Sequence, residues 1–69
     1  MTVEEARSLR NGDMVRHKYY GFILTVISNE EIKPTINSKG YIKVICATDY
    51  GVLFFFSHRQ LRIYKRKVH

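Results

Sequence analysis

The chain has 69 residues, 45% of them hydrophobic and 26% charged, which suits one folded domain and excludes a disordered chain. Its net charge of +6 arises from residues 32–69, where eight basic residues accompany one acidic residue, and it favours an anionic partner. The sequence contains neither an apolar run near the roughly 20 residues that span a bilayer nor a secretory signal at its start. We therefore expect a cytoplasmic protein with no membrane partner.

The first residues predict a short helix over about residues 3–9. Thr2 and Glu5 have the spacing of a capping box, in which both side chains accept backbone N–H groups at the helix start. Apolar residues then recur at helical spacing, at Val3, Ala6 and Leu9. Since so short a helix is unstable alone, we expect it to pack on the rest of the domain.

The rest of the chain predicts five short strands, because β-branched and aromatic residues dominate each run. The strands are expected at residues 13–18, 22–28, 41–47, 52–57 and 61–65. The polar residues 29–40 predict a long loop, and Ser57 and Gln60 repeat the capping-box spacing before the last strand. That spacing predicts a single helical turn, while the basic tail, residues 66–69, is expected to fray.

This order of elements predicts an all-β domain, namely a small five-stranded SH3-like barrel of the Tudor or KOW type. The single domain covers residues 1–69, with the barrel over about residues 11–65. Barrel closure removes the exposed edges that a sheet this small would otherwise have. The alternative is an OB-like barrel, which normally has a helix between its third and fourth strands, where this sequence predicts none.

Four short motifs lie along residues 11–64. They are Gly12-Asp13-Met14-Val15, Gly21 with Leu24-Thr25-Val26, Val44-Ile45-Cys46, and Phe56 with Leu61. Together they resemble the pattern of the YodC-type family of small, functionally uncharacterised bacterial and phage proteins. Leu24 stands where that family has methionine, and no tryptophan follows Cys46.

The segment from Gly12 to Lys18 also resembles the opening of the Tudor-like domain that closes some bacterial DNA helicases, Gly-Asp-x-Val-x-His. The Gly-x-Gly-Thr-Val that follows in that domain is matched only by Gly21 and Thr25-Val26. This resemblance implies docking onto a polymerase or a nucleoprotein machine. Both resemblances imply an SH3-like barrel.

The reactive side chains do not form a catalytic pattern. Cys46 lies in a strand with alternating apolar residues, so we interpret it as a small buried hydrophobe. His17, His58 and His69 share no metal-ligand spacing, and the sequence has no glycine-rich phosphate loop. We therefore expect no enzyme activity, no catalytic residue, no metal, no cofactor and no small-molecule substrate.

Strand alternation predicts an apolar outer face on the sheet. The inward residues are expected to be Leu24, Val26, Ile42, Val44, Cys46, Val52, Phe54 and Phe56. The outward residues then include an apolar patch made of Ile27, Ile45, Leu53 and Phe55. Three explanations are open: the N-terminal helix covers the patch, a homodimer buries it, or a partner protein binds it.

Basic residues are interleaved with tyrosines in two segments. The expected nucleic-acid-binding residues are Arg16, Lys18, Tyr19, Tyr20, Arg59, Arg62, Tyr64, Lys65 and Arg66. Cations attract phosphates, and tyrosine rings stack on unpaired bases. Because the first and last strands of an SH3-like barrel pair, the two segments are expected to form one patch. The alternative interpretation is scattered solvated charges.

The leading functional hypothesis is a small non-catalytic module that binds nucleic acid through a basic, tyrosine-bearing face. The competing hypothesis is a protein-interaction module or homodimer that uses the apolar patch. A lesser alternative is an aromatic cage for methylated lysine, formed by Tyr20 and Tyr50 with Asp49.

Overall fold

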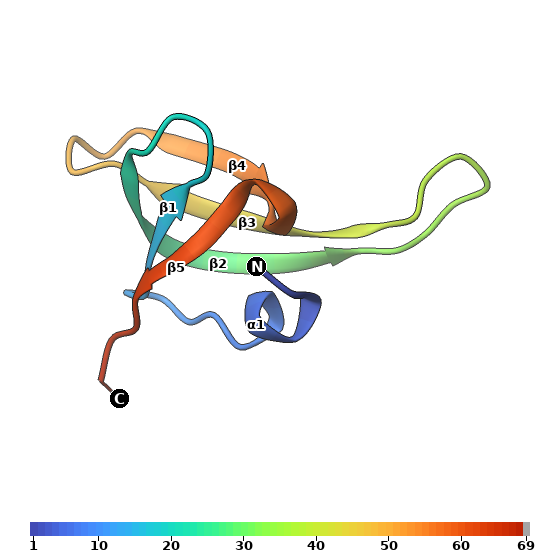
Figure 1. Cartoon of the computed structure of the whole chain (residues 1–69), viewed down its shortest axis with the longest axis horizontal. Coiled ribbons are helices and arrows are strands. Elements are labelled where there is room, and N and C mark those ends of the chain that lie inside the picture. The colour runs from blue at the N-terminus through green and yellow to red at the C-terminus, as the bar shows by residue number, and fades with distance from the viewer. Residues whose placement is uncertain (69) are drawn as a thin grey trace.

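Five antiparallel strands form one curved sheet in the order β4-β3-β2-β1-β5 (Figure 1). The computed structural model describes residues 1–68. The strands are β1 (Met14–His17), β2 (Ile23–Ile32), β3 (Tyr41–Ala47), β4 (Leu53–Ser57) and β5 (Leu61–Lys65). Helix α1 (Val3–Arg7) precedes them, and the 3-10 turn η1 (His58–Gln60) joins β4 to β5. The prediction of a mostly β domain with one short helix and one helical turn is confirmed.

Both predicted capping boxes are present at the helical starts. The Thr2 hydroxyl accepts the Glu5 N–H at 3.1 Å, and the Glu5 carboxylate accepts the Thr2 N–H at 2.9 Å. Before η1, the Ser57 hydroxyl accepts the Arg59 N–H, while the Gln60 side chain accepts the Ser57 N–H. These bonds satisfy N–H groups that a helix start leaves unpaired, and they explain where each helical element begins.

Strand β2 is longer than the sequence predicts, because its polar end, residues 29–32, pairs with β3 instead of forming a loop. A bulge between Val26 and Ser28 shifts the alternation of side chains at this point. Asn29 donates its amide to the carbonyls of Ala6 (3.2 Å) and Leu9 (3.0 Å). The Asn29 side chain therefore ties β2 to the end of α1 by satisfying two carbonyl acceptors there.

The apolar core lies between the sheet and α1. Its buried members are Ala6, Leu9, Val15, Leu24, Val26, Ile42, Val44, Cys46 and Leu61. The prediction of an inward side chain is wrong for two residues. Val52 precedes β4 and is exposed, and the Phe54 side chain is 37% exposed. Because β4 is an edge strand at the end of the sheet, Phe54 packs at the rim against other aromatic rings and not in the core.

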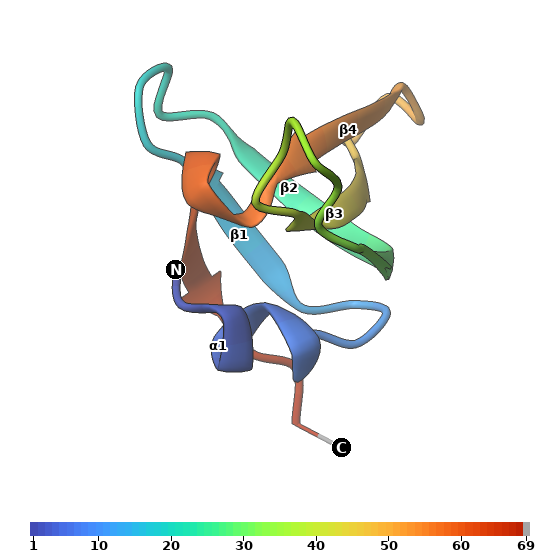
Figure 2. The same cartoon turned by 90° about the vertical axis from the view of Figure 1, so that its right-hand side faces the viewer.

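Helix α1 does not cover the apolar patch. Ala6 and Leu9 enter the core instead, and α1 lies at the end of the molecule opposite the turn between β1 and β2 (Figures 1 and 2). Phe55 consequently remains 63% exposed and Leu53 also remains exposed. This placement excludes the first of the three explanations, coverage by the helix, and leaves the homodimer and the partner protein open.

The edge strands β4 and β5 make no ladder with each other within residues 1–68, so closure of the barrel by strand pairing stays a prediction. Ring packing connects β1 to β4, with the His17 and Phe56 centroids 4.9 Å apart.

The C-terminal tail is attached to the domain where fraying was expected. The Lys67 N–H donates to the buried Asp13 carboxylate at 2.8 Å, and the Arg66 guanidinium donates to the Ser8 hydroxyl at 3.0 Å. The fraying prediction is therefore wrong for these two residues. Its last residue, 69, lies outside the described part of the chain.

Candidate nucleic-acid interface

The turn between β1 and β2 carries Tyr19 and Tyr20 at its tip. The His17 N–H donates to the Phe22 carbonyl at 3.0 Å, and the Gly21 N–H donates to the His17 carbonyl at 2.9 Å. Gly21 has a φ of +78°, a left-handed conformation that favours glycine. The turn is thus closed by backbone bonds at its base.

His17 supports this turn from below. Its side chain is only 2% exposed, and its Nδ1 accepts the N–H groups of Tyr19 and Tyr20, both at 3.1 Å. An imidazole nitrogen that accepts hydrogen bonds carries no proton, so the proton of the neutral ring belongs on Nε2. That atom is buried and has no hydrogen-bond partner within residues 1–68. His17 therefore acts on the turn through Nδ1.

Aromatic rings extend from this turn to β4. The Tyr20 and Phe22 rings are parallel within 2°, with their centroids 5.9 Å apart. The centroids of the Phe22 and Phe54 rings are 6.3 Å apart. His17 contacts both Tyr20 and Phe22 from beneath, at 4.7 and 5.2 Å. Phe22 and Phe54 were not predicted to be part of this ring cluster. The position of Phe22 next to a turn glycine was the only available signal.

Three cations surround the tyrosines. Arg16 lies directly opposite Arg62 where β1 pairs with β5, and its Nε donates to the Gly21 carbonyl at 3.0 Å. The Lys18 N–H donates to the Gln60 carbonyl at 2.9 Å, which places Lys18 beside η1. One shallow depression is lined by Arg16, Lys18, Tyr19, Tyr20 and Arg62, a set called here the basic aromatic face.

The other four predicted binding residues lie elsewhere. Arg59 projects from η1 and donates to the Gly40 carbonyl at 3.2 Å. Lys65 and Arg66 line a separate depression with Gly12 near the end of the described chain. Tyr64 is exposed on β5 but does not line the depression at the turn. The pairing of β1 with β5 agrees with the sequence prediction, but it brings together five of the nine residues.

Three of the four predicted patch residues, Ile45, Leu53 and Phe55, lie on the neighbouring strands β3 and β4. Ile45 pairs with Phe55, and Ala47 pairs with Leu53 across the same two strands. Ile27 lies at the β2 bulge and is partly exposed. Lys43 borders the patch, with its Nζ 5.4 Å from the centre of the Phe55 ring.

Cys46 is fully buried, and this burial raises the pKa of its thiol to about 11. Its surroundings fit a small core hydrophobe.

Within residues 1–68, no three His, Cys, Asp or Glu side chains lie close enough together to hold a metal ion. No helix in this part of the chain is long and apolar enough to cross a membrane. Tyr50 makes no ring contact with another described aromatic, so Tyr20 and Tyr50 do not form an aromatic pair.

Comparison with known proteins identified no relative, because no family, curated protein or solved structure matches this chain. The resemblances to the YodC-type family and to the helicase Tudor-like domain therefore stay predictions.

Proposed function

We propose that this protein binds single-stranded nucleic acid through the basic aromatic face. Bases stack on Tyr19 and Tyr20, while phosphates contact Arg16, Lys18 and Arg62. The observation that carries this proposal is the pair of tyrosines, 78% and 77% exposed, held on a buried histidine among three cations. Because the contacts involve ring faces and backbone charge, weak sequence preference is expected.

The anchoring of the turn favours binding. The His17 side chain accepts the backbone N–H groups of both tyrosines, and Arg16 donates to the Gly21 carbonyl, so the turn has little backbone entropy left to lose when a strand binds. The adjacent pair Arg16 and Arg62 brings two like charges together across two strands. An anionic ligand relieves that repulsion, which supports phosphate as the partner.

The first test is fluorescence anisotropy of labelled oligothymidine, as a single strand and as a duplex with oligoadenosine, at low and moderate salt. The single strand is expected to bind more tightly, because a duplex keeps its bases stacked. Affinity is expected to fall steeply with salt, and the slope reports how many phosphates are contacted. Absence of binding at low salt would overturn the proposal.

Matched variants locate the interface. Tyr20→Ala is expected to weaken single-strand binding by about 1–3 kcal/mol, the usual contribution of one stacked base. Tyr50→Ala is the control, since Tyr50 is also highly exposed but lies in the turn between β3 and β4. Arg62→Gln is compared in the same way with Arg10→Gln. Equal losses in a variant and its control would place the interface elsewhere.

The apolar patch supports a second candidate function, self-association or binding of a protein partner. The exposure of Phe55 and Leu53 on neighbouring edge positions of β4 favours it. Sedimentation velocity over a range of concentrations tests self-association. A dimer that dissociates in Phe55→Asp, while that variant stays folded, supports this candidate. If the protein sediments as a monomer at every concentration, self-association is excluded and only a protein partner is left.

A further inference from the structure

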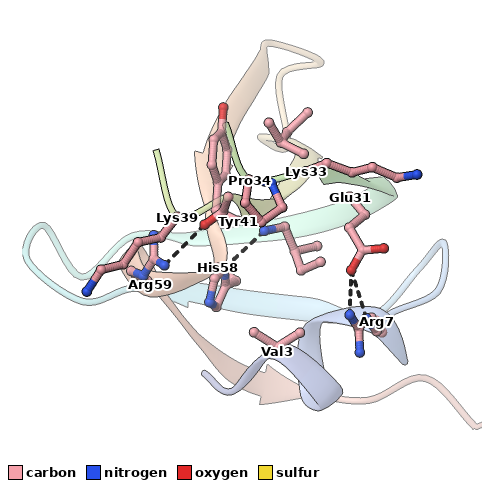
Figure 3. Close-up of a pocket in the computed structure, with 12 residues that line it drawn as sticks. Val3, Arg7, Glu31, Lys33, Pro34, Lys39, Tyr41, His58 and Arg59 are labelled. Carbon is pink, nitrogen blue, oxygen red and sulfur yellow. Dashed lines mark hydrogen bonds and ion pairs between the residues drawn. The ribbon is translucent and has the colours of Figure 1, made fainter. Parts of the chain in front are cut away.

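A third depression lies beside η1, between α1, the end of β2 and the connection formed by residues 33–40 (Figure 3). Its cavity volume is about 340 Å³, which is within the range of small-molecule sites. Val3, Pro34 and Tyr41 supply apolar and aromatic surface. None of the five residues of the basic aromatic face lines it.

His58 supplies a buried polar group to this depression. Its side chain is 4% exposed, and its Nδ1 accepts the Ile42 N–H at 3.1 Å (Figure 3). The proton of the neutral ring therefore belongs on Nε2, which donates to no group within residues 1–68. Burial, aided by the nearby Arg59, lowers the pKa of His58 and keeps the ring neutral at neutral pH. Nε2 is therefore a donor on a largely buried ring that has no acceptor within residues 1–68 and stays open to solvent or a ligand.

Four basic residues and one acidic residue line this depression together with His58. The Arg59 Nη2 is fixed by the Gly40 carbonyl at 3.2 Å, so its remaining N–H groups are oriented. Lys33 and Lys39 form no ion pair with the described part of the chain. Arg7 is paired with Glu31, at 3.2 Å between Nε and Oε1 (Figure 3). The depression is therefore positively charged even after the one carboxylate is counted.

We propose that this depression binds a phosphate monoester. The phosphate accepts the His58 Nε2–H and the Arg59 guanidinium, while the organic part lies against Val3, Pro34 and Tyr41. A doubly charged phosphate matches several cations better than a carboxylate does, and a fixed guanidinium suits its geometry. The proposal is independent of the proposed function, and it departs from the expectation that no small molecule binds.

The test is titration of the ¹⁵N-labelled protein with adenosine 5′-monophosphate and, separately, with adenosine. The monophosphate is expected to bind at least about tenfold more tightly and to shift the His58 Nε2 resonance, because only it carries the charge. Arg59→Gln is expected to abolish that preference. Lys65→Gln makes the same charge change outside the depression and is expected to preserve it.

A second variant isolates the histidine donor. In His58→Asn the amide oxygen replaces Nδ1 as acceptor for the Ile42 N–H, whereas the Nε2–H is lost. Weaker monophosphate binding, with adenosine binding unchanged, supports the proposal. Equal binding of monophosphate and adenosine, or equal losses in Arg59→Gln and Lys65→Gln, would overturn it. If His58→Asn does not fold, the comparison of Arg59→Gln with Lys65→Gln still tests the proposal.

The phosphate monoester has two sources, a free nucleotide or the phosphorylated end of a strand. Oligothymidine with a 5′-phosphate is compared with the same strand carrying a 5′-hydroxyl. Tighter binding of the phosphorylated strand, lost in Arg59→Gln, identifies the strand end; equal binding of both strands, while the monophosphate binds, identifies the free nucleotide. Sensitivity of the hydroxyl strand to Tyr20→Ala reports on the basic aromatic face alone, so either proposal can fail separately.

Discussion

His17 and His58 occupy the two candidate sites and are anchored in the same way. Both side chains are buried, and each uses Nδ1 to accept backbone N–H groups. They differ in the second nitrogen. Nε2 of His17 is enclosed beneath aromatic rings, whereas the His58 ring lines an open, positively charged depression.

This difference shows that surroundings, not residue type, determine what a buried histidine contributes. At the turn between β1 and β2, the imidazole orients two exposed tyrosines and contributes nothing polar to the surface. Beside η1, the same bond pattern leaves Nε2 as a donor on a ring that lines a depression. Three predictions test the contrast, in order of decreasing expected effect.

The largest effect is expected from glycine substitutions next to the two sites. Gly40 and Gly21 have nearly the same φ, +79° and +78°. A Cβ on Gly40 would lie 2.6 Å from the Ile32 carbonyl oxygen, whereas on Gly21 it would meet nothing closer than 3.9 Å. We expect Gly40→Ala to cost about 2–5 kcal/mol in unfolding free energy, since strain and overpacking add.

In Gly21→Ala, the new side chain meets no close neighbour and only the left-handed backbone conformation is unfavourable. We expect it to lower the unfolding free energy by about 1–2 kcal/mol. Urea unfolding of both variants measures the difference. Similar losses would mean that the wall of the depression formed by residues 33–40 yields as readily as the tyrosine turn.

The next effect concerns the support of the turn. His17→Leu preserves apolar packing but removes the acceptor of the Tyr19 and Tyr20 N–H groups, so a loss of about 1–3 kcal/mol is expected. Hydrogen exchange of these two amides is expected to accelerate, and nucleic-acid affinity to fall. His17→Asn restores an acceptor and serves as the control. Unchanged amide protection in His17→Leu would show that the turn is held by its backbone bonds alone.

The smallest effect is a pH dependence of stability from His58. Its pKa is lowered from the usual 6.5 by burial first and by Arg59 next, so the unfolded chain binds a proton more readily than the folded one. The stability that the neutral His58 contributes is fully present above the pKa of this histidine in the unfolded chain. It is lost as pH falls from that value through the lower pKa in the folded protein. One such group changes the unfolding free energy by at most about 1.4 kcal/mol per pH unit.

The comparison of wild type with His58→Asn isolates this contribution from the carboxylates. Urea unfolding at neutral and mildly acidic pH is expected to show a shallower loss in the variant. Parallel pH profiles would mean that His58 is protonated equally in the folded and unfolded states.

Local signals predicted most of the fold. Each capping box spans four consecutive residues, so it is visible in the local sequence. The boundaries predicted for β3 and β5 agree with the structure. Alternation in β2 and β3 correctly predicted five buried residues because those strands have neighbours on both sides. At edge strand β4 the same rule failed for Phe54, since alternation alone does not show that one side of the strand lacks a neighbour.

The candidate sites depend on contacts that are distant in sequence. Arg59 and Arg62 are three residues apart, yet η1 directs Arg59 toward Gly40, while β5 places Arg62 opposite Arg16. The Asn29 amide donates to the Leu9 carbonyl, 20 residues earlier in the chain, and no local pattern indicates that contact. The role of His58 likewise required Ile42 as its donor, and no pattern around His58 in the sequence indicates that partner.

The pairing of β1 with β5 also has a consequence for how the chain folds. Val15 and Ile63 are paired although they lie far apart in the chain, and β5 supplies Leu61, a fully buried core residue. Contacts of such long sequence separation slow folding, because loop closure precedes any gain from packing. On the ribosome, the core is therefore expected to stay incomplete until β5 has left the exit tunnel, and folding is then expected in one late cooperative step.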